Sequence, residues 1–136
     1  MSFSGVNYLA ILIAAVAGFA VSGIWYTLLF ARPWMAAQGL TEEAILQRGP
    51  SPRPFVIALI ANLVMALILA VIASCLENPT LPNTIGIALL VWIGFVITVL
   101  LVVNQFEDRK PMLTIIDGGN WLAVLVVMGA IIGAFG

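Results

Sequence analysis

Residues 54–76 read PFVIALIANLVMALILAVIASCL and contain no charged side chain. An α-helix rises about 1.5 Å per residue, so about 20 apolar residues are enough to cross the hydrocarbon core of a bilayer. Three other stretches of comparable length lack Asp, Glu, Lys and Arg, namely residues 1–31, 78–106 and 118–136. The pattern predicts an all-α membrane protein with a single domain, residues 1–136, that is a bundle of four transmembrane helices at 6–30, 54–76, 84–106 and 111–135.

The composition also indicates a membrane protein, because 63% of the residues are hydrophobic and only 8% are charged. Charged residues make up roughly a quarter of an average soluble domain. We do not expect the first apolar segment to be a cleaved signal, because no Lys or Arg precedes it and it continues to Phe30. A formal charge of -1 without a basic tract disfavours nucleic acid as a partner and leaves the lipid bilayer as the expected one.

The residue types that usually carry catalysis are scarce. The chain has no His and one cysteine, Cys75, so imidazole metal sites and imidazole bases are excluded. The acidic pairs at 42–43 and 107–108 lie in loops that also contain Arg or Lys, which is typical of solvated charge rather than of an acid/base pair. We therefore expect no enzymatic activity, no metal and no cofactor.

The basic residues predict the orientation in the membrane. Arg32, Arg48 and Arg53 fall in the first loop, and Arg109 and Lys110 in the third, while residues 77–83 and both ends of the chain have no Lys or Arg. Short loops rich in Lys and Arg stay in the cytoplasm. We expect a multi-pass protein of the inner (cytoplasmic) membrane with both termini on the outer face.

The first loop contains the pattern of a short helix. Thr41 is a good N-cap, Glu42 and Glu43 would follow in the first turn, and Gly49 would end the helix. Apolar residues of this loop, among them Trp34, suit the boundary between membrane and water. We expect an interfacial helix that anchors the loop, and a docking site for a membrane partner is the less favoured alternative.

The polar residues within the predicted spans share one depth. Asn104 lies six residues from Lys110 and Asn120 lies ten, which places them roughly 9 to 15 Å inside the boundary on the basic side. Helical spacing also puts several of them on common faces. The candidate polar layer consists of Ser22, Trp25, Tyr26, Asn62, Asn104, Asp117, Asn120 and Trp121.

Two interpretations of this layer stay open. The side chains can bond one another and fix the helix register, or they can line a small pocket open to the cytoplasm. Asp117 favours the pocket slightly, because an acid inside a membrane usually marks an ion path, a proton relay or a ligand site. A basic residue reaching down to pair with Asp117 is the structural alternative. Gly118 and Gly119 could also loosen or kink the helix at this point.

Several motifs along the chain resemble the bacterial membrane family known as domain of unknown function 1761. They are Val6-Asn7-Tyr8-Leu9-Ala10, Gly23-Ile24-Trp25-Tyr26, Pro33-Trp34-Met35, Trp92-Ile93-Gly94-Phe95, residues 104–107, Asp117-Gly118-Gly119-Asn120-Trp121-Leu122 and Met128-Gly129-Ala130-Ile131. The resemblance covers nearly the full length and implies a four-helix membrane protein. It implies no activity and no catalytic residues.

The leading hypothesis is a non-enzymatic membrane protein that binds or conducts a small solute or ion through the polar layer. The rival hypothesis is a structural or accessory subunit of a larger membrane complex. Stripes of small residues spaced four apart, such as Ala10, Ala14 and Gly18, suit close helix contacts. They lead us to expect a homo-oligomer or another membrane-protein partner.

Overall fold

The computed structural model describes residues 3–49 and 51–135, and four of its helical segments are long and apolar enough to cross a membrane. These spans are α1 (Tyr8–Ile24) with the π-helical turn η1 (Trp25–Leu29), then α4 (Arg53–Ser74), then α5 (Leu81–Val91) with the π-helical turn η2 (Trp92–Val96) and α6 (Ile97–Phe106), and finally α7 (Pro111–Phe135). The prediction of four apolar membrane helices is confirmed. The third span begins at Leu81, earlier than predicted, because the hydroxyl of Thr80 accepts a hydrogen bond from the Asn83 amide and caps the helix.

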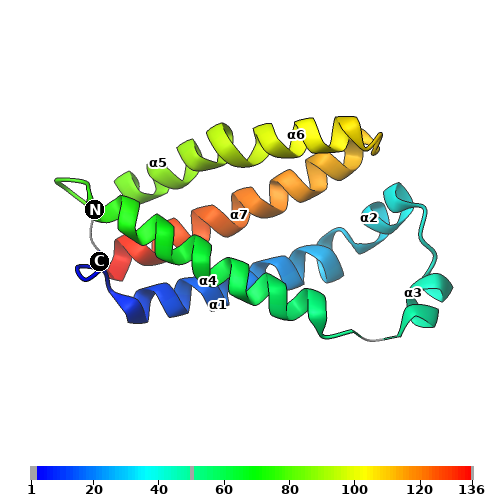
Figure 1. Ribbon diagram of the computed structural model, residues 1–136, viewed down its shortest axis with the longest axis horizontal. Helices are drawn as coiled ribbons and strands as arrows, with labels where there is room; N and C mark the ends of the chain where they lie inside the picture. Colours follow the sequence, from blue (N-terminus) through cyan, green and yellow to red (C-terminus); the bar gives the residue numbers. More distant parts are fainter. Residues whose placement is uncertain (1–2, 50, 136) are drawn as a thin grey trace.

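The bundle has two distinct ends (Figure 1). The two termini lie together at one of them, the terminal end, where the Asn7 side-chain amide donates a hydrogen bond of 3.1 Å to the Phe135 carbonyl. The opposite end, called the loop end here, carries the connection from η1 to α4 and the turn from α6 to α7. All five basic residues of the chain belong to elements at the loop end, namely Arg32, Arg48, Arg53, Arg109 and Lys110.

The helix α7 holds the bundle together, because it lies between the third span and the pair formed by α1 and α4 (Figure 1). Small residues allow these close contacts. A Cβ atom added to Gly18 of α1 would lie 2.7 Å from the Met128 side chain of α7, and one added to Gly129 would lie 3.0 Å from the Thr84 carbonyl of α5. Close approach of this kind lets dispersion and hydrogen bonds hold helices together in lipid, where the hydrophobic effect gives little drive.

The irregular backbone of the spans lies in the first and third, and each π-helical turn begins at a Trp. In η1 the Phe30 amide bonds to the Trp25 carbonyl at 2.9 Å, which is the wider π-helical pattern. The hypothesis that Gly118 and Gly119 loosen or kink the fourth span is wrong, because α7 is one continuous helix from Pro111 to Phe135. These glycines instead make room for side chains from other helices.

The connection at the loop end holds two short helices, α2 (Ala31–Gln38) and α3 (Glu42–Arg48). The helix expected after Thr41 is present as α3, and the Thr41 hydroxyl accepts a hydrogen bond of 3.1 Å from the Ala44 amide. The helix α2 was not predicted. Pro33 lies in its first turn, where proline is tolerated, and Gly39 ends it with a φ of 72°.

Candidate functional site

A cavity of about 610 Å³ lies near the loop end, between α1, η1, α2, α4, α6 and α7. One part of its wall is polar and the other is aromatic. The polar side chains are Ser22, Tyr26, Thr27, Asn62, Arg109, Asp117 and Asn120. The aromatic side chains are Phe19, Tyr26, Trp34, Phe55 and Trp121. This cavity is called the loop-end cavity below.

Most of the predicted polar layer meets at this cavity. Its wall includes the predicted residues Ser22, Tyr26, Asn62, Asp117, Asn120 and Trp121. The other two predicted residues lie outside it and hold helices together. Trp25 donates its indole N–H to the Ile116 carbonyl at 2.9 Å, and Asn104 donates to the Thr114 hydroxyl at 2.8 Å.

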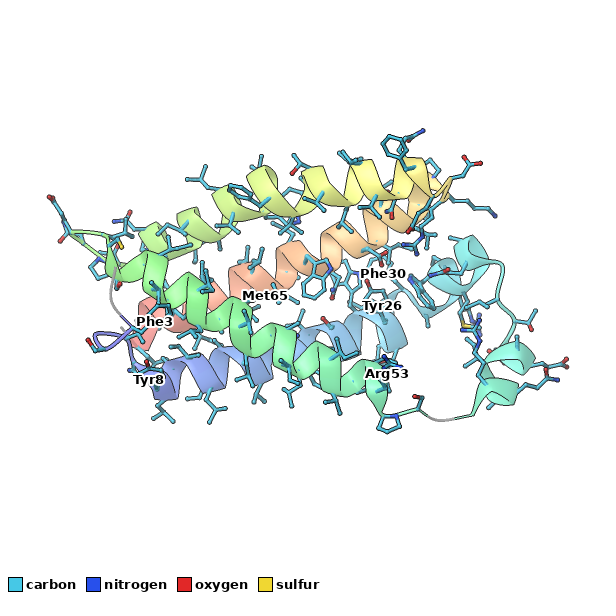
Figure 2. The ribbon with its side chains drawn as sticks, in the orientation of Figure 1. Phe3, Tyr8, Tyr26, Phe30, Arg53 and Met65 are labelled. Atoms are coloured by element: carbon cyan, nitrogen blue, oxygen red, sulfur yellow. The ribbon has the colours of Figure 1, made fainter. Side chains whose placement is uncertain are left out.

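Asp117 is half-buried at the middle of the polar wall, and its hydrogen-bond partner is Tyr26. The Tyr26 hydroxyl donates to the Asp117 carboxylate at 2.5 Å. Figure 2 shows Tyr26 on the loop-end side of the bundle, far from Tyr8 at the terminal end. The guanidinium of Arg109, which also lines the cavity, donates at 3.2 Å to the Asn104 side chain. The hydrogen bonds therefore join Asp117 to a phenol and Arg109 to an amide.

Two tryptophans fix the backbone on either side of Asp117. The indole of Trp25 binds the carbonyl of Ile116, and the indole of Trp92 donates at 2.8 Å to the carbonyl of Gly118. Gly119 is needed for the first contact, because an added Cβ atom would lie 2.8 Å from the Trp25 ring. Each π-helical turn thus places its first residue, a Trp, against α7 at the level of Asp117. Turns of this kind are frequent at functional sites.

Three side-chain oxygens of residues on the cavity wall are shielded from solvent and have no hydrogen-bond partner: Ser22 Oγ, Asn62 Oδ1 and Asn120 Oδ1. Asn62 and Asn120 are each only 1% exposed. A buried acceptor without a donor costs about 1–3 kcal/mol. The Asn62 oxygen lies against α1, 2.6 Å from where a Cβ atom on Gly18 would be. The interpretation in which the side chains of the polar layer bond one another does not hold for these three oxygens.

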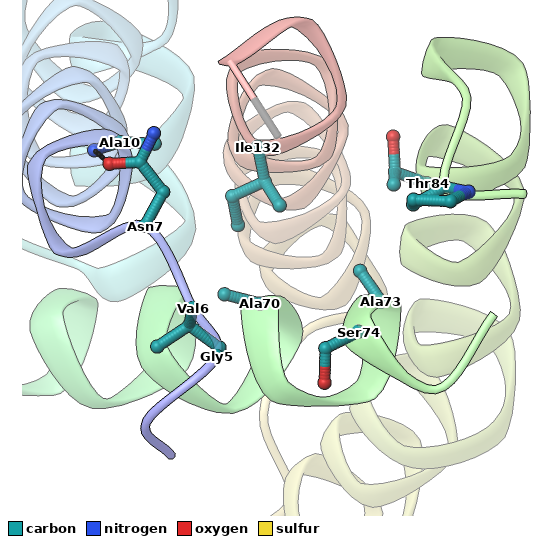
Figure 3. A pocket seen from close by; sticks show the side chains of 10 residues that line it. Gly5, Val6, Asn7, Ala10, Ala70, Ala73, Ser74, Thr84 and Ile132 are labelled. Atoms are coloured by element: carbon teal, nitrogen blue, oxygen red, sulfur yellow. Dashed lines mark hydrogen bonds between the residues drawn. The ribbon is translucent and has the colours of Figure 1, made fainter. Parts of the chain in front are cut away.

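A second cavity, of about 230 Å³, lies at the terminal end between α1, α4, α5 and α7 (Figure 3). Its polar side chains have partners. Asn7 bonds the Ala10 amide and the Phe135 carbonyl, Ser74 bonds the Val71 carbonyl, and Thr84 bonds the Gly129 carbonyl. The polar groups of this second cavity are thus used by the fold itself.

Sequence reasoning missed three residues of the aromatic wall, Phe19, Trp34 and Phe55. Phe19 is spaced three and seven residues before Ser22 and Tyr26, and Phe55 is seven before Asn62, so both share a helix face with predicted residues. That spacing was a usable signal. No such signal existed for Trp34, because its position on the cavity wall depends on α2, which was not predicted.

Among residues 3–49 and 51–135, no group of three or more His, Cys, Asp and Glu side chains could hold a metal ion. The family model described as a protein of unknown function, DUF1761, matches residues 9–133. The chain belongs to this DUF1761 family. The search of curated proteins found no match, and the search of solved structures found none. The predicted family is confirmed, and no activity comes with it.

Proposed function

We propose that this DUF1761 protein binds a small solute in the loop-end cavity. The observation that carries the proposal is the Asp117 carboxylate on the wall of the loop-end cavity, where its hydrogen-bond partner is the neutral Tyr26 hydroxyl. An acid within a membrane span is expensive and usually serves an ion or a ligand. A ligand that donates hydrogen bonds to this carboxylate would offset part of that cost.

We further propose that the cavity faces the cytoplasm of a bacterium and that both termini face outward. Support comes from the loop end, which holds the cavity and all five basic residues. The terminal end includes residues 75–80, which contain one acid and no base. Loops rich in Lys and Arg remain on the cytoplasmic side of the inner membrane, and the short helix α3 would then rest on that surface.

Cysteine labelling tests this proposal without knowledge of the ligand. In a Cys75→Ala background, Ala58→Cys places a thiol on the cavity wall, whereas Ala66→Cys, about two helical turns deeper, replaces a residue with 0% exposure. A charged, membrane-impermeant maleimide should label position 58 in inside-out vesicles and leave position 66 unlabelled. Without labelling at position 58 from either side, the cavity is closed to water and the proposal fails.

The orientation has its own control in the same background. Phe135→Cys places a thiol at the terminal end, where Phe135 is 58% exposed. The impermeant reagent should label this position in intact cells whose outer membrane has been permeabilised. Labelling only in inside-out vesicles would reverse the orientation, and the cavity would then open outward.

Solute passage is an extension of binding. Four residues on the helices that line both cavities are fully buried, each with 0% exposure: Ala14, Ala66, Val124 and Met128. These residues close the path between the cavities, so transport requires a second arrangement of the helices. Proton or solute flux into liposomes, compared between the natural chain and Asp117→Asn, separates transport from binding alone.

The rival proposal is an accessory subunit or a homo-oligomer built on the third span. The observation in its favour is the large apolar surface of that span, where Phe95 and Phe106 are 74% and 90% exposed. The mass of the protein in detergent, with Phe95→Ala and Phe106→Ala as variants, tests this interface. We also propose a non-enzymatic role, supported by the acidic pairs at 42–43 in α3 and at 107–108 in the turn before α7, neither of which lines the cavity.

A further inference from the structure

We propose that the ligand of the loop-end cavity is a protonated organic amine with a hydrocarbon or aryl group, a proposal that rests on the solute-binding function above. The ammonium would sit beside Asp117, and the apolar part would lie against the aromatic wall. Three features of the cavity lead to this class of ligand: its charge, the acceptor oxygens of Asp117 and its aromatic side chains.

The charge around Asp117 favours a cation. The carboxylate accepts one hydrogen bond, from the neutral Tyr26 hydroxyl, which leaves its charge without a cationic hydrogen-bond partner. The basic residue on the same wall, Arg109, donates instead to Asn104. A ligand ammonium beside Asp117 would supply the charge-assisted hydrogen bonds that shorten and strengthen such contacts.

The acceptors of Asp117 favour a ligand rich in donors. An ionised carboxylate offers two acceptor oxygens, and the Tyr26 hydroxyl donates to one of them. An ammonium group carries three N–H donors and no acceptor. Phosphates and carboxylates carry only acceptors when ionised and would repel Asp117, so they fit poorly beside it.

The size and the aromatic wall favour an organic cation over a metal ion. A volume of about 610 Å³ falls within the roughly 300–1,000 Å³ of small-molecule sites. Phe19, Trp34 and Trp121 offer ring surface that a bare Na⁺ or K⁺ would leave mostly unused. Aromatic faces attract cations and contact apolar groups equally well, so they suit a molecule that carries both.

Binding of three probes with the same ring tests the inference: 2-phenylethylamine, which is cationic, 2-phenylethanol, which is neutral, and phenylacetate, which is anionic. Equilibrium dialysis with the full chain in detergent would measure each affinity at neutral pH. We expect the amine to bind at least about tenfold more tightly than the alcohol, the effect of one modest charge contact. Phenylacetate should bind most weakly. Because the site is proposed to take an organic cation rather than Na⁺, excess NaCl should weaken amine binding no more than choline chloride does at equal ionic strength.

Two variants and one control test which residues of the cavity bind the amine. Asp117→Asn keeps an acceptor for the Tyr26 hydroxyl and should remove the preference for the amine over the alcohol. Phe55→Ala changes an aromatic wall residue that is 65% exposed, so folding should survive while both probes bind less tightly. Glu107→Gln removes an acid at an exposed site outside the cavity and should leave all three affinities unchanged.

The outcomes separate this inference from the proposed function. Equal binding of amine and alcohol, or amine binding that Asp117→Asn leaves intact, overturns the ammonium proposal while solute binding stands. Failure of all three probes also overturns it, and the labelling of Ala58→Cys then decides whether the cavity itself is open. If position 58 is closed to the maleimide, the failure lies with the proposed function.

Discussion

The Tyr26 hydroxyl donates a hydrogen bond of 2.5 Å to the Asp117 carboxylate, and this bond joins side chains 91 residues apart in the sequence. It connects the π-helical turn at the end of the first span with the fourth span. The preceding residue, Trp25, bonds the Ile116 carbonyl, so two adjacent side chains of η1 hold two adjacent residues of α7. Asp117, the only acid within the predicted spans, is therefore oriented by a side chain from another helical segment.

Replacing Tyr26 by Phe should destabilise the protein by about 1–2 kcal/mol, because the carboxylate loses a donor at a depth where water is scarce. The apparent melting temperature in detergent measures this loss. Tyr8→Phe is the matched control, since its hydroxyl donates to the Phe3 carbonyl at an exposed site of the terminal end. A melting temperature lowered equally by both variants would contradict a special role for the Tyr26 bond.

Asp117→Asn should cost less stability than Tyr26→Phe. The amide keeps an oxygen that accepts the Tyr26 hydrogen bond, and it removes the desolvation of a charge inside the membrane. The same melting assay applies, with the double variant included. Destabilisation by Asp117→Asn that exceeds that of Tyr26→Phe would show that the carboxylate has another partner in the folded state.

Gly18→Ala should destabilise the bundle by about 1–3 kcal/mol through overpacking. The added Cβ atom would lie 2.6 Å from the Asn62 side-chain oxygen and 2.7 Å from the Met128 methyl. Gly23→Ala, on the same helix, is the control, because its Cβ atom would meet nothing within 4 Å. Since Ala favours helix over Gly by about 1 kcal/mol, Gly23→Ala should raise the melting temperature while Gly18→Ala lowers it.

The sequence placed the polar residues at one level along the helices, because level follows directly from the constant rise of a helix. Counting residues from Arg53 and Lys110 was enough to place Asn62 and Asn120 at one level, and both residues line the loop-end cavity. The common face of Ser22 and Tyr26 followed from their spacing in the same way.

The rest could not be predicted, because it depends on how the spans rotate and cross. Nothing in the spacing of Trp25 or Trp92 shows that their indoles bond backbone carbonyls of α7. The same limit applies to Gly119, which looked like a helix breaker and is instead the surface under the Trp25 ring. Contacts between helices are decided by packing, which a single sequence does not display.

Thr84→Val tests the polar contact that joins α5 to α7. The Thr84 hydroxyl donates at 2.8 Å to the Gly129 carbonyl across the helix interface, and Val keeps nearly the same shape. We expect a loss of about 0.5–1.5 kcal/mol, the usual range for a hydrogen bond within a membrane. Thr98→Val is the control, because Thr98 bonds the Gly94 carbonyl of its own span at an exposed site. Equal stability of the two variants would refute the interhelical contribution.

The turn from α6 to α7 offers a substitution that should stabilise the protein. Asp108 has a φ of 58°, in the left-handed region that favours glycine. The surrounding hydrogen bonds form a Schellman motif: the Asp108 amide bonds the Gln105 carbonyl at 3.2 Å, and the Arg109 amide bonds the Asn104 carbonyl at 2.9 Å. Asp108 thus occupies the position just after the helix where glycine is preferred.

Asp108→Gly should therefore raise the melting temperature, by relief of about 0.5–1 kcal/mol of backbone strain. Asp108→Asn should change it little, since Asn also tolerates this conformation, and Asp108→Val should lower it because a β-branched side chain is strained there. The rank order Gly, Asn, Val separates backbone strain from charge, because all three variants remove the same carboxylate. Equal melting temperatures for the three would mean that charge and not strain governs this turn.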